Sequence, residues 1–150
     1  MDVLRTLPTW AVVAVCGLAA QAVKLVLYSA ARRHLALTAF AQGNGLPSLP
    51  AAVLACLAVL VGRRAGWAAP ETGFALVFAV IVVHDTLKLG WLADRNREAL
   101  VRILAHVRAR GQAGRWALAY LDPRAHHPAH VALGIAFGGV FALAFAGMPR

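Results

Sequence analysis

Four long apolar runs constrain the fold of this chain more than any other feature of its sequence. They cover residues 7–28, 46–62, 73–93 and 130–148. A helix rises about 1.5 Å per residue, so each run can cross, or nearly cross, about 30 Å of hydrocarbon. With 61% hydrophobic residues and a mean hydropathy of +0.68, a soluble domain of 150 residues could not bury them. The sequence predicts one integral membrane domain over residues 1–150, an all-α polytopic membrane helix bundle with about four transmembrane helices.

The positive charges lie mainly between these runs and predict an orientation in the membrane. Lys and Arg total 15, against 6 Asp and Glu. Nine arginines lie in the loops at one end: Arg32, Arg33, Arg95, Arg97, Arg102, Arg108, Arg110, Arg115 and Arg124. Four lie at the other end: Arg5, Arg63, Arg64 and Arg150. Because cytoplasmic loops carry the excess of Lys and Arg, both termini are predicted to lie outside the cytoplasm.

The same charges indicate which partners to expect. Membrane lipids with anionic head groups are expected at the basic cytoplasmic loops. Nucleic acid is not expected, because the basic residues are spread over several loops and form no recognisable reading module. An integral, multi-pass membrane location is expected.

Residues 94–110 follow the third apolar run and have a different periodicity. An apolar stripe recurs at helical spacing through Leu100, Ile103, Leu104 and Val107. Glu98 and Arg102 are spaced to pair on the polar face. The pattern predicts a cytoplasmic amphipathic helix in the membrane interface, and a solvated helix packed on the bundle is the alternative.

The second apolar run is short, and prolines lie at its start. Pro47 and Pro50 suit a first helical turn, where a missing amide donor removes no hydrogen bond. The polar residues 42–45 just before it are expected to be flexible and to be able to enter the membrane as a re-entrant segment.

The last apolar run carries a small residue at every fourth position, which places these residues on one helix face. They are Gly134, Gly138, Ala142 and Ala146. Small residues let another helix approach closely, so this face predicts tight helix packing. The spacing leaves open whether the packed helix belongs to this chain or to another membrane protein subunit.

Four ionisable residues lie within the apolar runs, where ionisable groups are costly and therefore informative. They are Lys24, His84, Asp85 and Lys88. Asp85 is spaced to pair with Lys88 in one helix, or with Lys24 across helices. A silent polar cluster that sets helix register and a pocket for an anionic head group both fit this pattern. Cys16 and Cys56 are interpreted as small packing residues.

Three histidines precede the last run, at His126, His127 and His130. Metal binding is not expected, because Pro128 interrupts the helix that would align them and no cysteine or carboxylate stands close by. Interfacial histidines without chemistry and a phosphate-handling histidine are the alternatives. No cofactor is expected.

The order of several short motifs resembles the divergent branch of the type-2 phosphatidic-acid phosphatases, membrane proteins related to vanadium haloperoxidases. The motifs are QAVK at residues 21–24, GNGLPS at residues 43–48, Asp85, and HHP at residues 126–128. In the wider superfamily one histidine attacks phosphorus, a second protonates the leaving oxygen, and Lys and Arg neutralise phosphoryl charge. The resemblance implies that His126, Lys24 and Asp85 are remnants of such a site. It also implies a location in a bacterial inner (cytoplasmic) membrane.

The chain departs from the family pattern at each catalytic motif. Where the family has its first-motif histidine, this chain has Pro50, and the neighbouring serine is Leu49. Gly90 and Trp91 occupy two arginine positions, and Lys88 cannot offer the bidentate fork of an arginine. His130 occupies the position of the carboxylate near the third-motif histidine.

These departures favour a non-catalytic membrane protein on a degenerate phosphatase-like scaffold, a pseudoenzyme that acts as an interaction subunit or assembly factor of a membrane complex. In this reading other membrane protein subunits bind through the last run. One alternative is a lipid or isoprenoid phosphatase with rearranged chemistry, in which His126 attacks and His84 or His130 replaces the lost acid. The other is a lipid-binding protein that keeps the pocket without turnover.

Overall fold

The computed structural model describes residues 7–32, 46–109 and 128–146, and these form helices without any strand. The helices are α1 (Thr9–Arg32), α3 (Leu49–Ala65), α4 (Pro70–Ala109) and α5 (Pro128–Ala146). The prediction of an all-α helix bundle is confirmed. Of these helices α1, α4 and α5 are long and apolar enough to cross a membrane. With 17 residues, α3 is about 25 Å long, so its crossing remains a prediction.

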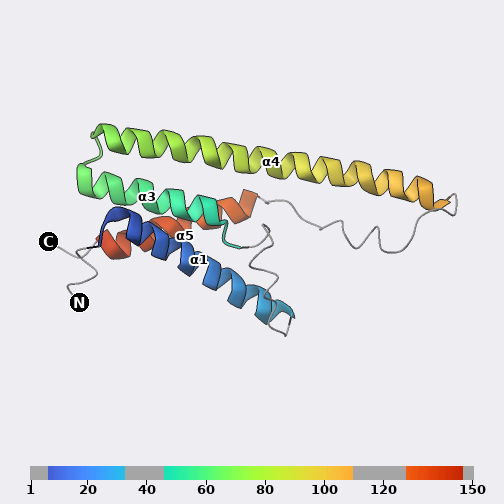
Figure 1. The fold of residues 1–150 in the computed structure, drawn as a ribbon, viewed down its shortest axis with the longest axis horizontal. Coiled ribbons are helices and arrows are strands. Elements are labelled where there is room, and N and C mark those ends of the chain that lie inside the picture. Colours follow the sequence, from blue (N-terminus) through green and yellow to red (C-terminus); the bar gives the residue numbers. More distant parts are fainter. Residues whose placement is uncertain (1–6, 33–45, 110–127, 147–150) are drawn as a thin grey trace.

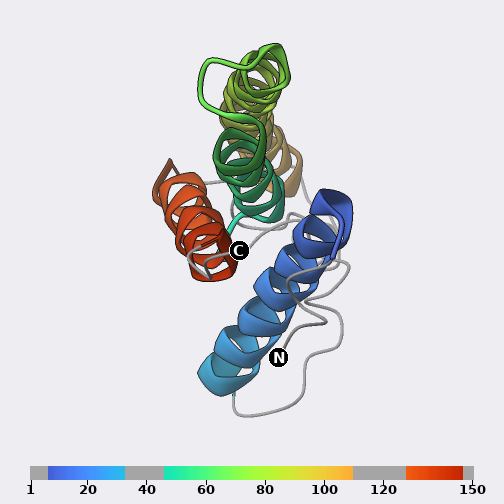
Figure 2. The ribbon, with the colours of Figure 1, turned by 90° about the vertical axis from the view of Figure 1, so that its left-hand side faces the viewer.

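The shorter α3 lies at the centre of the bundle (Figures 1 and 2). It packs against α5, α4 and α1, with α4 on one side and α1 and α5 on the other. Successive helices alternate in direction, so α3 and α5 are parallel and α1 is antiparallel to both. Consequently α3 and α5 begin at the end of the bundle toward which α1 runs.

The central position of α3 follows from its small side chains. Its buried residues include Ala51, Ala52, Cys56 and Ala58. In a membrane, helices associate through close packing rather than hydrophobic transfer, so a helix with small residues around it can contact several neighbours. Both cysteines are free and buried in this packing, as the sequence predicted.

Glycines of α5 bring its backbone against α3. A Cβ atom added at Gly134 would lie 2.5 Å from the Ser48 carbonyl oxygen, and one at Gly138 would overlap the Ala52 carbonyl. Ala142 is fully buried in the same core. The helix that packs on these small residues therefore belongs to this chain. The side chain of Ala146 lies outside the described residues.

A short turn joins α3 to α4 and is closed by hydrogen bonds. Gly66 has φ of 104°, a left-handed conformation that favours glycine, and its N–H donates to the Gly62 carbonyl oxygen at 3.1 Å. The buried Thr72 hydroxyl donates to the Gly66 carbonyl oxygen at 2.7 Å. Arg64 donates to Thr9 Oγ1 at 3.0 Å, which ties this turn to the start of α1.

Residues 94–109 differ from the expected separate surface helix. They continue the third predicted span as one uninterrupted α4 of 40 residues, about 60 Å long, and extend beyond the other helices (Figure 1). The sequence between Gly90 and Ala109 contains no proline and is rich in Ala, Leu and Arg, which favour helix. An amphipathic stripe can therefore mark the continuation of a span as well as a new helix. Whether this part lies in the interface remains a prediction.

The orientation predicted from the arginine count is testable by cysteine labelling. Arg63 and Arg102 are exposed and lie near opposite ends of α3 and α4, and the native cysteines are fully buried. We expect Arg63→Cys to react with a membrane-impermeant maleimide on intact cells, and Arg102→Cys to react only after permeabilisation. The reverse labelling pattern would show that the orientation is wrong.

Candidate functional site

The candidate site lies where the first turns of α3 and α5 meet. The Ser48 N–H donates to the His130 carbonyl oxygen at 3.1 Å, which joins the two helix starts. The close approach of Gly134 to Ser48 holds them together. Because α3 and α5 are parallel, the positive ends of both helix dipoles point to the same end of the bundle. This end is electrostatically favourable for an anion.

Ser48 brings a buried hydroxyl to this end. It is the N-cap residue of α3, and its hydroxyl makes no capping hydrogen bond. The residue is 1% exposed, and its Oγ has no hydrogen-bond partner among the described residues. An N-cap serine normally accepts from the second or third amide of the helix, and Pro50 at the second position has none. The Ser48 hydroxyl is therefore a buried polar group without a partner among the described residues, next to the meeting point of the two helix starts.

Lys24 lies at the same end, on α1. Along the antiparallel α1 and α3, Val12 and Cys16 pack with Leu60 and Cys56, and Gly17 lies against Leu49. Farther along α1, Val23 lines the same groove as Leu46 and Pro47, so the neighbouring Lys24 lies near the segment that leads into α3. Its side chain is only 7% exposed. A buried ammonium near two helix N-termini increases the positive potential at this end.

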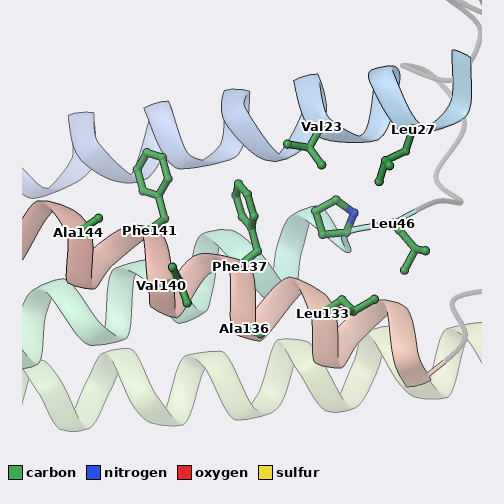
Figure 3. A pocket seen from close by; sticks show the side chains of 10 residues that line it. Val23, Leu27, Leu46, Leu133, Ala136, Phe137, Val140, Phe141 and Ala144 are labelled. Carbon is green, nitrogen blue, oxygen red and sulfur yellow. The ribbon is translucent and has the colours of Figure 1, made fainter. Parts of the chain in front are cut away.

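A groove runs from this end between α1 and α5 (Figure 3). Its volume is about 580 Å³, within the range of small-molecule sites. Every side chain that lines it is apolar: Val23, Leu27, Leu46, Pro47, Leu133, Ala136, Phe137, Val140, Phe141 and Ala144. Phe137 and Phe141 project from α5 toward α1, and Val23 and Leu27 line the groove from α1, nearer to Leu46. Val140, Leu27 and Leu133 are more than half exposed, so the groove is open to its surroundings.

The ionisable residues of α4 form a separate group. His84 Nδ1 and Asp85 Oδ1 are 3.3 Å apart, and both side chains are exposed. Lys88 is also exposed and makes no ion pair with Asp85. Lys24 lies on α1, on the other side of α3. The structure thus joins His84 to Asp85 and places Lys24 apart from them.

Gly90 and Trp91, the residues expected at two arginine positions of the motif, differ in their surroundings. Gly90 is buried on α4. The Arg95 guanidinium carbon lies 4.7 Å from the centroid of the Trp91 ring, which is a cation–π contact.

Some predicted site residues cannot be placed. His126 and His127, and residues 42–45 with their predicted re-entrant segment, lie outside the described residues. His130 is described and lies in the first turn of α5. Within residues 7–32, 46–109 and 128–146, no three His, Cys, Asp or Glu side chains gather as a metal site would require.

The sequence analysis did not single out Ser48 or the groove. A serine two residues before a proline at a helix start is a signal that could have identified Ser48. The groove has no comparable signal, because its lining is apolar like the rest of each span. It arises only from the relative placement of α1 and α5.

Comparisons with known proteins bear on the resemblance noted in the sequence. No curated protein and no solved structure matches the chain. Residues 6–141, nearly the whole chain, match the family described as the Divergent PAP2 family. This agrees with the resemblance to type-2 phosphatidic-acid phosphatases carried by the short motifs. On that match and its helical membrane scaffold, the chain belongs to the Divergent PAP2 family.

Proposed function

We propose that this chain is a non-catalytic lipid-binding membrane protein, which holds an anionic phospholipid without hydrolysing it. The observation that carries the proposal is the apolar groove between α1 and α5, which begins beside the cationic end of the bundle. In this proposal the groove takes an acyl chain and the bundle end takes the phosphate.

The dimensions of the groove support an acyl chain as its occupant. On α5 the lining runs from Leu133 to Ala144, about 16 Å of helix. One leaflet supplies half of the ~30 Å hydrocarbon layer, so a single chain fits this length. The lining offers no polar atom to a polar solute, and its open side allows a chain to enter from the bilayer.

The end of the bundle supports a phosphate as the head-group anchor. Lys24 supplies a full positive charge, and the starts of α3 and α5 supply oriented dipoles. The Ser48 hydroxyl supplies a donor. Charge-assisted hydrogen bonds to phosphate oxygens are strong in such a low-dielectric setting.

The absence of hydrolysis follows from the chemistry of the replaced positions. Pro50 cannot donate a proton to a leaving oxygen. Neither Gly90 nor Trp91 can neutralise phosphoryl charge. Binding needs only a cation and donors, which remain, whereas turnover needs a proton donor and charge stabilisation in the transition state.

The second candidate function is that of an interaction subunit or assembly factor in a membrane complex, in a bacterial inner membrane. The exposed polar residues on α4 favour it, because polar residues in spans usually face protein. The small-residue face of α5 is occupied by α3, so a partner subunit would use another surface. Recovery of the same foreign subunit in mild detergent, lost in Asp85→Lys, would support this candidate.

The lipid-binding proposal is tested with purified protein in mild detergent and fluorescent phosphatidic acid or phosphatidylcholine. We expect tighter binding of phosphatidic acid, and a loss of about 10–100-fold in Lys24→Met, because charged hydrogen bonds contribute about 1.5–3 kcal/mol. Ala136→Trp, which fills the groove, is expected to weaken both lipids. Its matched control is Ala132→Trp, at an exposed α5 position that does not line the groove.

Equal affinity for both lipids, unchanged by Lys24→Met, would exclude the head-group site. Equal binding by Ala136→Trp and Ala132→Trp would exclude the groove. Thermal melting of each variant separates loss of binding from loss of folding.

A further inference from the structure

The outer face of α4 carries ionisable side chains at a depth where lipid would surround them. Asp85 lies fifteen residues after Pro70, about 22 Å along α4 and within a ~30 Å hydrocarbon layer that begins at Pro70. Its side chain is 63% exposed and that of its partner His84 is 72% exposed. Exposure of such groups to hydrocarbon is costly, and they normally face protein or water.

No described part of this chain covers that face. The buried residues of α4 are Thr72, Ala75 and Gly90, and they lie on the side that packs against α3. The ionisable group lies on another side of the helix. Its His84–Asp85 hydrogen bond satisfies one carboxylate oxygen and leaves Lys88 unneutralised by Asp85.

Most of α4 is exposed, and one set of its exposed residues has the spacing of a helix–helix seam. Steps of four and three residues link Phe74, Phe78, Ile81, Asp85, Lys88 and Leu92, and all six are exposed. This alternation keeps side chains on one stripe of a helix that pairs with another. The stripe is apolar at both ends, with one acid and one base at adjacent positions in its middle.

We infer that this stripe is the interface between two copies of the chain. Two copies in one membrane share their orientation, so a two-fold axis normal to the membrane pairs their α4 helices in parallel. Asp85 of each copy then lies one helical turn from Lys88 of the other. The two symmetric ion pairs remove the cost of exposing Asp85 and Lys88 to hydrocarbon. The apolar residues of the stripe pack around these pairs: Phe74, Phe78, Ile81 and Leu92.

The charges on the stripe favour a second copy of the chain as its partner, rather than lipid or an unrelated membrane span. An acid and a base three residues apart are self-complementary under this two-fold axis, whereas a lipid tail neutralises neither. The contact ends near Leu92, because the stripe continues with Arg95 and Arg102, and no acid on the stripe neutralises these like charges as Asp85 neutralises Lys88. This inference does not depend on lipid binding by the groove.

Charge exchange tests the interface in full-length protein reconstituted in liposomes. Single-molecule photobleaching at several protein-to-lipid ratios counts the copies in each complex. We expect wild type to form dimers. Asp85→Lys and Lys88→Asp each place like charges together, and we expect the dimer dissociation constant to rise at least about tenfold.

Complementation distinguishes a self-interface from general damage. Differently tagged Asp85→Lys and Lys88→Asp chains should form a mixed dimer when co-reconstituted, because acids of one then face lysines of the other. The double variant with both substitutions should recover dimers by itself. Glu98→Lys, an equal charge change on a part of α4 off the stripe, is expected to leave dimerisation unchanged.

Three results would each overturn the inference. Wild type could remain monomeric at every protein-to-lipid ratio. Dimers could persist equally in both single variants, or mixing these variants could fail to restore dimers. Recovery of the chain only with a different membrane protein, and never with itself, would instead assign the face to that protein.

Discussion

Gly138→Ala is expected to destabilise the protein by about 3 kcal/mol, at the upper end of the usual cost of overpacking. The added Cβ would overlap the carbonyl group of Ala52 on α3. Because the obstacle is backbone rather than a flexible side chain, α3 and α5 must separate to admit the methyl group. Their separation also disrupts the Ser48–His130 hydrogen bond that joins the two helix starts.

The neighbouring glycine supplies the matched control. A Cβ at Gly139 meets nothing within 4 Å, so Gly139→Ala is expected to be neutral or to stabilise the helix by about 0.5–1 kcal/mol. Reversible unfolding in mixed micelles compares the two variants. Equal stabilities would show that α3 and α5 do not pack as closely as the structure has them.

Purified protein is expected to release no phosphate from phosphatidic acid or prenyl diphosphates. Loss of the acid alone removes about 10²–10⁴-fold in rate, and loss of charge neutralisation adds a comparable factor. Pro50 lies in the first helical turn of α3, Gly90 is buried, and Trp91 stacks with Arg95.

The control for this prediction is His126→Ala, because the motif resemblance implies that His126 stands at the position of the family nucleophile. Both proteins should match the background rate of phosphate release. Turnover that disappears in His126→Ala would overturn the non-catalytic proposal and favour a phosphatase with rearranged chemistry. In that case His130→Gln and His84→Gln would identify the replacement acid. These two histidines lie on different helices, α5 and α4, so their effects are separable.

The resemblance to the phosphatase family was recognisable from the sequence because its motifs occur in order along the whole chain. The site was recognisable only in part. Lys24 stood out as an ionisable residue in an apolar run, and the structure buries it near the start of α3. Asp85 stood out for the same reason, yet it lies on the exposed face of α4. Hydropathy identifies an unusual residue in a span but does not say which way it points.

The periodicity of the sequence also predicted one wrong helix boundary, at residue 94, where α4 is continuous. The stripe from Leu100 to Val107 indicated an amphipathic helix correctly but said nothing about its connection to the preceding span. A helix ends where the backbone is interrupted by residues such as glycine or proline, and Gly90 alone does not interrupt α4. Along α4 the pattern changes from apolar on all sides to apolar on one face. This change alters the environment that stabilises the helix, but it does not interrupt the backbone.

The sequence by itself determined that this chain is a bundle of apolar helices, because membrane hydrocarbon demands long runs whose backbone groups are satisfied within each helix. It also determined that the last helix packs closely, because a small residue at every fourth position leaves a flat face. Only the tertiary structure decided that α3 fills this face and that α1 and α5 enclose a groove. The physical reason is that helices in a membrane select neighbours by shape, and shape complementarity depends on residues from two helices at once.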